Sequence, residues 1–242
     1  MAKPGRAASP AVGLAWLAML VARSMHPEWL SNAYVIAAAE GGVAVFVDSG
    51  ADIGPLVAAV EEWGARPVAL LRTHSHHDHV VNEGELAGRY EIPVVFEPGE
   101  WEWDGLAVRG LATPGHADEH VSFVIGEEVV ATGDVLFRDA VGGGNVEQVR
   151  RSVMDVLLAL PDDTLVLPGH TEETTIGRER EANPFVRVWS GAEPELGEPV
   201  RVAGRDATLL IWSPDYDGKG KAQVRFDDGT EAIVGGSRVE RF

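Results

Sequence analysis

Residues 73–79, Thr-His-Ser-His-His-Asp-His, constrain this chain more than any other stretch. Between His74 and His79 the segment carries four histidines and one carboxylate. Imidazole and carboxylate groups are the usual ligands of hydrolytic transition-metal ions. A single tetrahedral site cannot use this many ligands, because it has room for only four. The segment therefore predicts two metal ions, or one ion with a crowded surrounding shell.

From Asn32 onward, short apolar strands alternate with helices, which is typical of an α/β fold. Predicted strands are Tyr34–Ala38, Val43–Val47, Val68–Arg72, Pro93–Phe96, Leu106–Leu111, Val121–Ile125, Val129–Thr132 and Leu165–Leu167. Predicted helices are Ile53–Trp63, Val80–Tyr90 and Asn145–Leu160, the last with Gln148 placed for a capping box. An earlier strand is expected at Leu17–Ser24.

Three further polar residues, His116, Asp134 and His170, each follow an apolar strand through a turn that contains glycine. In α/β folds the carboxyl ends of strands gather at one edge, where sites form. The glycines beside these residues, Gly115, Gly133 and Gly169, allow the backbones to approach closely. We therefore expect all these polar residues on the same rim as the histidine cluster.

The spacing divides the ligands into two sets. His74 and His76 are two residues apart, so on an extended segment they point the same way. Asp78 and His79 lie where the chain turns into a helix and can point to a second position. We expect one ion to be held by His74, His76 and His116 and the other by Asp78, His79 and His170, with Asp134 as the bridge. Two ions about 3.5–4 Å apart can hold a hydroxide, formed from water whose pKa falls to about 7, and can polarise a carbonyl.

The order His-x-His-x-Asp-His, Thr-Pro-Gly-His, Thr-Gly-Asp and Pro-Gly-His resembles the metallo-β-lactamase superfamily, in particular its glyoxalase II-like (hydroxyacylglutathione hydrolase-like) branch. The resemblance runs from Asn32 to about Trp189 and includes Asp48 and the Asn183-Pro184-Phe185 segment. It implies an αββα sandwich and a binuclear site that holds two divalent ions, zinc first and iron or manganese as alternatives. It also implies hydrolysis of a thioester or related ester, with Asp78 orienting the hydroxide.

Two other activities share these motifs. The resemblance to persulfide dioxygenases implies a single iron held by His74, His116 and Asp134, and lactonases are a further alternative. The zinc β-lactamases of the main classes use a cysteine ligand, whereas this chain has no cysteine and Asp134 stands in that place. A small β appendix is expected where glyoxalase II has a helical domain with basic glutathione-binding residues, which argues against a glutathione thioester.

The composition changes after Trp189. We expect a catalytic domain over residues 1–189, of which 1–16 form a loose extension, then a linker at 190–198 and a small SH3-like all-β appendix at 199–242. Its predicted strands are Val200–Val202, Thr208–Trp212, Ala222–Phe226 and Glu231–Val234. Within it, Trp212, Tyr216 and Phe226 are expected in the core, with an aromatic binding patch on the appendix as the alternative, and Lys219 and Lys221 are expected at exposed turns.

Charge narrows the range of partners. The 242-residue chain has 38 acidic and 20 basic residues and a net charge of −18, which disfavours nucleic-acid binding. We expect a small-molecule substrate and no membrane partner; a homo-oligomer is compatible with the sequence. The apolar stretch Ala11–Ala22 follows Lys3 and Arg6 but lacks a clear cleavage site and is too short to span a bilayer, so we expect a cytoplasmic protein rather than an exported one.

Four polar residues near the motifs are expected to play supporting or structural roles. His77 is expected to face solvent or to support a ligand, and His120 to form a hydrogen bond near a strand start. Asp48 is expected beside the metal ligands. His26 is expected to be structural or exposed.

Overall fold

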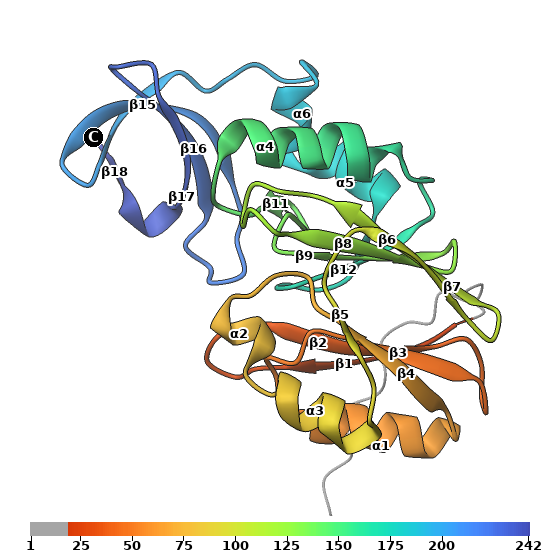
Figure 1. The fold of residues 1–242 in the computed structure, drawn as a ribbon. Helices are drawn as coiled ribbons and strands as arrows, with labels where there is room; N and C mark the ends of the chain where they lie inside the picture. Colours follow the sequence, from red (N-terminus) through yellow and green to blue (C-terminus); the bar gives the residue numbers. More distant parts are fainter. Residues whose placement is uncertain (1–18) are drawn as a thin grey trace, which may run out of the picture.

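The computed structural model describes residues 19–242, in which two β-sheets face each other and helices cover both outer faces (Figure 1). The space between the sheets is filled by aliphatic and aromatic side chains from both, among them Ile36, Leu71, Phe123 and Leu167. These layers confirm the αββα sandwich that the sequence motifs imply. None of the helices in this part of the chain is long and apolar enough to cross a membrane.

The first sheet has the order β1-β2-β3-β4-β5. Its strands are β1 (Leu20–Met25), β2 (Asn32–Ala37), β3 (Val43–Val47), β4 (Arg66–Leu71) and β5 (Val94–Val95). Strands β3, β4 and β5 are parallel, and the other neighbours are antiparallel. The outer face packs against α1 (Gly54–Trp63) and α3 (Glu83–Tyr90) through buried residues such as Phe46, Leu56 and Leu86.

The second sheet has the order β13-β12-β9-β8-β7-β6. Its strands are β6 (Gly99–Trp103), β7 (Leu106–Ala112), β8 (Val121–Ile125), β9 (Val129–Gly133), β12 (Leu165–Pro168) and β13 (Thr174–Thr175). Only β9 and β12 are parallel within it. Because these two strands run in the same direction, their carboxyl ends reach the same edge of the sheet.

The outer face of the second sheet is covered by α4 (Val146–Arg151), α5 (Ile176–Ala182) and α6 (Pro184–Trp189) (Figure 1). A short hairpin of β10 (Leu136–Phe137) and β11 (Ala140–Val141) follows directly after β9. Helix α4 begins at Asn145, whose side-chain oxygen accepts a hydrogen bond from the Gln148 backbone N–H at 3.1 Å. The predicted cap is confirmed, although the Asn145 backbone N–H donates to Gly115 rather than to Gln148.

The C-terminal residues form a third, antiparallel sheet with the order β17-β16-β15-β14-β18. Its strands are β14 (Glu198–Val202), β15 (Arg205–Ser213), β16 (Lys221–Phe226), β17 (Glu231–Gly235) and β18 (Val239–Arg241). One face encloses a small core, and Trp212 and Phe226 pack against it as predicted. Leu210, Ile211 and Ile233 instead join the core beneath α4 and α6. The C-terminal sheet is therefore packed against the sandwich by apolar contacts.

Several predicted boundaries are wrong. The helix predicted at Val80–Tyr90 is two helices, α2 (His77–Val80) and α3, with a break at Val81–Asn82. The helix predicted at Asn145–Leu160 is α-helical only to Arg151 and continues as a wider turn at Ser152–Val156 and a 3-10 turn at Leu157–Ala159. Strands β6, β10, β11, β13 and β18 and helices α5 and α6 were not predicted. The first strand begins at Leu20, and residues 1–18, including the predicted extension, lie outside the described residues.

Candidate metal centre

Strand ends bring the seven predicted ligands together. His74 follows β4, Asp134 follows β9 and His170 follows β12, while His116 lies on the loop after β7. The parallel strands end in register, because Pro168 pairs with Gly133 and the Gly169 N–H donates to the Gly133 oxygen at 2.8 Å. Ligand atoms lie within 4.8 Å of one another in three overlapping groups: His74, His76 and His116; His74, His79 and Asp134; Asp78, His79 and His170.

The first group consists of three imidazoles. His76 Nδ1 lies 3.0 Å from His74 Nε2 and 2.9 Å from His116 Nε2. Zinc–nitrogen bonds of about 2.0–2.1 Å would place the nitrogens of a tetrahedral site roughly 3.3 Å apart. The three nitrogens therefore need to move apart only slightly to hold one ion. His74 is buried, whereas His76 is exposed.

The second group combines carboxylates with imidazoles. Asp78 Oδ2 lies 3.8 Å from His79 Nε2 and 3.6 Å from His170 Nε2. Asp134 connects this group to the first one: its Oδ2 is 3.4 Å from both His116 Nε2 and His170 Nε2, and its Oδ1 is 3.4 Å from His79 Nε2. A carboxylate in this position can offer an oxygen to each of two ions.

Hydrogen bonds from outside the cluster fix the orientation of several imidazoles. Asp48 Oδ2 bonds to His79 Nδ1 at 2.9 Å and accepts from the Thr73 hydroxyl at 2.8 Å, which confirms the expected place of Asp48. The Gly143 carbonyl lies 2.9 Å from His116 Nδ1, and the Leu30 carbonyl lies 3.0 Å from His170 Nδ1. Each contact leaves Nε2 directed at the group, as metal-binding histidines require.

His120 supports Asp134 through the backbone. The Asp134 N–H donates to His120 Nε2 at 3.1 Å, and His120 Nδ1 lies 2.9 Å from the Thr113 hydroxyl. Burial lowers the pKa of His120 to about 3, so the ring is neutral and can accept this bond. The hydrogen-bonding role predicted for His120 is confirmed, and its partner is the backbone of a candidate ligand.

Burial and charge act in opposite directions on the cluster. Burial lowers the pKa of His74 and of His116 below the usual value for an imidazole. Burial also acts to lower the pKa of His79, but Asp134 and Asp48 outweigh it and hold that pKa well above its usual value. Burial acts to raise the pKa of Asp134, but His79 and His170 outweigh it and hold that pKa well below its usual value. A metal ion bound by His79 would compete with a proton for the ring.

Two buried polar atoms in the cluster lack a hydrogen-bond partner. His79 Nε2 and Asp134 Oδ1 are both buried and unpaired in the described part of the chain. An unsatisfied buried polar atom is costly and needs an explanation. The two atoms lie 3.4 Å from each other within one ligand group, and a cation bound by that group would satisfy both. The donor set of nitrogens and carboxylate oxygens thus fits a divalent transition-metal ion.

Close backbone approach at the site depends on glycine. A Cβ atom added to Gly169 would stand 2.2 Å from Asp134 Oδ1 and 2.8 Å from His79 Cε1. Real Cβ atoms do not come so near to other atoms, so any side chain here would displace two candidate ligands. This confirms the close approach predicted beside His170.

The hairpin that follows Asp134 is held by a buried carboxylate. Glu179 is fully buried and accepts hydrogen bonds from the Thr174 hydroxyl at 2.6 Å and the Asn183 amide at 2.9 Å. It also accepts from the Asp139 backbone N–H at 2.8 Å and pairs with Arg178. A buried charge is stable only when it is paired and hydrogen-bonded in this way. The network ties α5 to the β10–β11 turn and so fixes the chain beside the site.

Two predictions for the C-terminal sheet are wrong. Tyr216 is not in the core of that sheet: its ring stacks on His170, with centroids 4.2 Å apart and an interplanar angle of 11°. Lys221 is not exposed, because it is buried and pairs with Asp215 at 3.0 Å. Tyr216 lies more than 40 positions from any ligand in the sequence, and no motif marks it; only the PDYDG turn indicated a loop there. His77 and Lys219 are exposed, and His26 stacks on Trp29.

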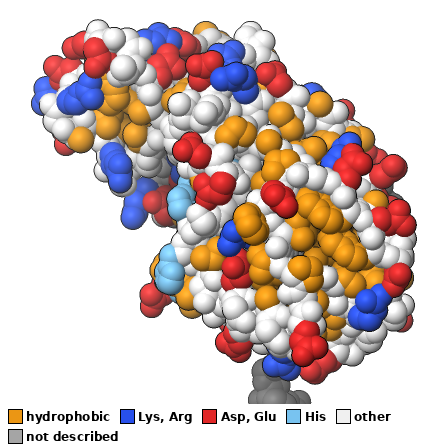
Figure 2. Space-filling view, viewed as in Figure 1, with side chains coloured by type: hydrophobic (Ala, Val, Ile, Leu, Met, Phe, Trp, Pro, Cys, Tyr) orange, Lys and Arg blue, Asp and Glu red, His pale blue; other side chains and the backbone are white. Residues whose placement is uncertain are grey.

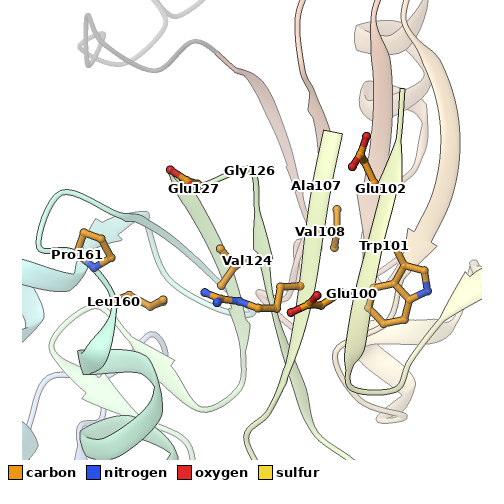
Figure 3. Close-up of a pocket in the computed structure, with 11 residues that line it drawn as sticks. Glu100, Trp101, Glu102, Ala107, Val108, Val124, Gly126, Glu127, Leu160 and Pro161 are labelled. Atoms are coloured by element: carbon orange, nitrogen blue, oxygen red, sulfur yellow. The ribbon is translucent and has the colours of Figure 1, made fainter. Parts of the chain in front are cut away.

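The site opens into a hollow between the C-terminal sheet and the sandwich, where histidine side chains reach the surface (Figure 2). A different cavity, of about 660 Å³, is lined by residues of β6, β7 and β8 (Figure 3). Glu100, Trp101, Val124 and Leu160 are among the residues that line it, and none of the seven candidate ligands does.

Several bacterial proteins are similar to this chain over most of their own length. The probable metallo-hydrolase YqgX of Bacillus subtilis is 32% identical over 171 residues, which are 54% of this chain and 81% of that protein. Hydroxyacylglutathione hydrolase GloC of Haemophilus influenzae is 32% identical over 184 residues, 59% of this chain and 87% of that protein. No protein-family model matches the chain.

Two solved structures share the arrangement of strands and helices. The BLEG-1 B3 metallo-β-lactamase has a TM-score of 0.63 and 25% identity, covering 69% of this chain and 99% of that one. TTHA1623, solved in a di-iron-bound form, has a TM-score of 0.56 and 30% identity, covering 67% of this chain and 98% of that one. In each comparison a substantial part of the present chain lies outside the match.

Proposed function

The chain belongs to the metallo-β-lactamase superfamily, and we propose from this premise that it is a hydrolase with two divalent metal ions that cleaves a thioester or a related ester. The main support for this proposal is the position of Asp134. Its two oxygens lie 3.4 Å from nitrogens of both ligand groups, and one of them is buried without a partner. This is the arrangement expected of a carboxylate shared by two ions.

The donor set supports zinc ions, with iron as the alternative. Three imidazoles form one group, and two imidazoles with a carboxylate form the other, which suits both metals. The di-iron form of TTHA1623 shows that a similar protein can hold two iron ions. When bound, such ions supply a nucleophile at neutral pH and stabilise negative charge on a carbonyl oxygen.

The protein's own residues position the reactants. The Asp78 side chain is 29% exposed, so its carboxylate can accept a hydrogen bond from the attacking water and orient it. Asp48 holds His79, Gly143 holds His116 and Leu30 holds His170, which keeps the ligand nitrogens in place through turnover. The hollow gives a small carbonyl compound access from solvent on one side.

The choice of a thioester rests on similarity. GloC, whose name states hydrolysis of hydroxyacylglutathione, is 32% identical to this chain over most of its own length. A thioester carbonyl is more readily attacked than an amide, and two cations beside it can hold the charge that develops on oxygen. The proposed substrate is therefore a small acyl thioester or ester.

The decisive experiment measures metal content and hydrolysis together. The purified protein is expected to contain about two divalent ions per chain and to cleave simple acyl thioesters at neutral pH. Asp134→Ala should lose the ions and should lower kcat/KM by more than about 100-fold, the upper range for loss of a residue that merely supports a ligand. Asp163→Ala is the matched control, because Asp163 is exposed and remote from the cluster.

The same assays separate the alternatives. Purified active protein without metal, or undiminished activity in Asp134→Ala, would contradict the proposal. Iron-dependent oxygen uptake with a persulfide and no hydrolysis would identify a persulfide dioxygenase instead. Cleavage of lactones with no cleavage of thioesters would identify a lactonase.

A further inference from the structure

The C-terminal sheet, which lies beside α4 and β11 in Figure 1, meets the metal centre at two places. On the loop between β15 and β16, the Tyr216 ring stacks on the candidate ligand His170, with centroids 4.2 Å apart. In β17, Ile233 forms an isolated antiparallel bridge with Gly144, in the loop before α4. That loop carries the carbonyl that bonds to His116. Because His116 and His170 belong to different ligand groups, the sheet reaches both halves of the centre.

The contact at His170 restrains the ring on several sides. The Leu30 carbonyl lies 3.0 Å from His170 Nδ1. A single hydrogen bond at one nitrogen leaves a ring free to tilt about that bond. Tyr216 covers one face of the ring at an interplanar angle of 11°, and Phe137 meets it edge-on with centroids 5.8 Å apart. The aromatic contacts therefore remove the tilt that the hydrogen bond alone would allow.

The position of Tyr216 is itself fixed by a buried ion pair. The Tyr216 backbone N–H donates to Asp215 Oδ1 at 3.0 Å, and Asp215 pairs with Lys221, the first residue of β16, at 3.0 Å. The two side chains are only 4% and 10% exposed. The Lys221 ammonium also lies 5.5 Å from the centroid of the Tyr216 ring. Because breaking a buried ion pair is costly, the pair keeps the loop and its tyrosine against His170.

The contact at His116 acts through the glycine loop, Gly142–Gly144. The Gly143 carbonyl lies 2.9 Å from His116 Nδ1, and the next residue, Gly144, pairs with Ile233. A Cβ atom added to Gly144, whose φ is +137°, would stand 2.0 Å from the Gly115 oxygen. The glycine loop is therefore packed between the backbone beside His116 and the edge of β17, and it has no room to shift on its own.

The Ile233 side chain keeps β17 in contact with the glycine loop. It belongs to the same buried cluster as Val141, which directly precedes the loop, and Val149 of α4, which follows it. The neighbouring side chains of Ala232 and Val234 pack instead on the core enclosed by the C-terminal sheet. Alternate residues of a strand point to opposite faces, so Ile233 is the member of this trio that faces the sandwich.

Buried hydrogen bonds hold the sheet as a whole against the sandwich. The Trp189 indole N–H donates to Gln223 Oε1 at 2.8 Å, and both side chains are buried. The Gln223 amide donates in turn to Glu231 Oε2 at 2.6 Å, and the Arg150 guanidinium of α4 donates to the Trp189 carbonyl at 2.9 Å. Moving the sheet would break these bonds and leave buried groups unpaired. The sheet therefore has one fixed position relative to the candidate ligands.

We propose that the C-terminal sheet positions one candidate ligand in each half of the metal centre. Tyr216 fixes the ring of His170, and Ile233 fixes the glycine loop whose Gly143 carbonyl orients His116. Both are positioning residues, and neither touches the reacting atoms. The inference rests on the proposed binding of two ions at this site, and it makes the sheet part of the metal centre instead of a separate module.

Zinc titration tests the two contacts separately. Tyr216→Ala should weaken binding of the ion at His170 by about 10-fold to 100-fold, the range for loss of a group that supports a ligand, and should leave the ion at His116 near wild-type affinity. Ile233→Ala should do the reverse. Competition with a chromogenic chelator measures both affinities, and nitrogen-15 spectra of labelled histidine identify the ring that loses its ion.

The control variants distinguish positioning from general loosening. Tyr216→Phe keeps the stacked ring and should restore wild-type affinity. Val234→Ala shortens a side chain of the same strand on the face toward the sheet's own core and should leave both affinities unchanged. If Ile233→Ala does not fold, Ile233→Val, which removes one carbon, should weaken the ion at His116 in the same direction. Wild-type affinities in the Tyr216 and Ile233 variants, or an equal loss in Val234→Ala, would overturn the inference.

Spectra of the metal-free protein separate this inference from the proposed function. Stacking should move the ring-proton signals of His170 upfield in the wild type and Tyr216→Phe, but not in Tyr216→Ala. The bond to Gly143 should favour the His116 tautomer with its proton on Nδ1, and Ile233→Ala should lower the share of that tautomer. Wild-type spectra in both alanine variants would overturn the inference even if zinc binds and thioesters are cleaved. The expected changes in a protein that binds no zinc would overturn the proposed function and leave the two positioning roles standing.

Discussion

The two halves of the candidate metal centre differ in how the protein supports them. In the half formed by His74, His76 and His116, His76 is exposed, and its hydrogen-bonding contacts are with the other two rings. In the half formed by Asp78, His79 and His170, His79 is fully buried and held by Asp48, and His170 is buried and held by a backbone carbonyl. The contrast is sharpest between His76, which is exposed, and His79, which is part of the core.

This difference indicates which candidate ligands also stabilise the fold. Removing the exposed His76 takes one contact from the buried His74 Nε2, 3.0 Å away, but leaves the hydrogen bond between His74 Nδ1 and the Thr73 hydroxyl in place. Removing a buried ligand also leaves other buried polar atoms unpaired, and this costs stability. The two halves can therefore be told apart by measuring metal content and stability in the same variants.

The largest expected difference in the free energy of unfolding is between the variants His79→Ala and His76→Ala. His79→Ala leaves Asp48 and Asp134 without their buried partner, so we expect loss of metal and a fall of about 3–5 kcal/mol in the free energy of unfolding. His76→Ala should lose one ion and change stability by no more than about 0.5 kcal/mol. Denaturant unfolding of metal-free protein gives the stabilities, and elemental analysis gives the ions. Similar stability losses in both variants would show that the halves do not differ.

Gly169→Ala tests the close packing between the halves. The added methyl group would overlap Asp134 Oδ1, so we expect loss of tight metal binding and more than about 100-fold loss of hydrolysis. Gly84→Ala is the control, because a Cβ atom there meets nothing within 4 Å and α3 should gain slightly from alanine. Wild-type metal affinity in Gly169→Ala would mean that the ligands are not packed as the structure has them.

Asp48→Asn probes the support of the buried half alone. The variant keeps the shape of the side chain but weakens the bond to His79 Nδ1, so the affinity of one ion should fall about 10-fold to 100-fold. The ion held by the imidazole half should be retained. Metal titration with a chromogenic chelator measures both affinities, and Asp163→Asn serves as the surface control. Equal weakening of the two ions would contradict a separate role for Asp48.

The smallest expected effect is the contribution of His120 to the pH dependence of stability. Its pKa is lowered to about 3 in the folded chain, while the unfolded chain has the ordinary value near 6.5. Between these values the unfolded state binds the extra proton, so stability falls as pH is lowered from about 6.5 toward 3. His120→Gln should reduce that slope, in metal-free protein, by up to about 1.4 kcal/mol per pH unit. Parallel pH profiles of wild type and variant would exclude this contribution.

Local sequence patterns predicted many strands of the sandwich, because an apolar run bounded by turn residues depends only on residues close in the sequence. The runs at β2, β3, β8 and β9 are almost wholly apolar and bounded by turn residues, so their strands were found within one or two positions. Strand β6 was missed because its sequence, Gly-Glu-Trp-Glu-Trp, follows a proline and sits at the sheet edge. The helix break at Val81–Asn82 was missed because the amide of Asn82 bonds to Ser49 and Ala51, which lie far away in the sequence.

The sequence by itself predicted seven candidate ligands, since residues of the right chemistry follow predicted strands, and the structure brings their ligand atoms close together. Only the tertiary structure decided which residues surround that set. The Gly143 carbonyl reaches His116 across 27 positions, and Tyr216 reaches His170 across 46. The physical reason is that ligand spacing follows from the local geometry of strands and turns, whereas the walls of the site depend on how the C-terminal sheet packs on the sandwich.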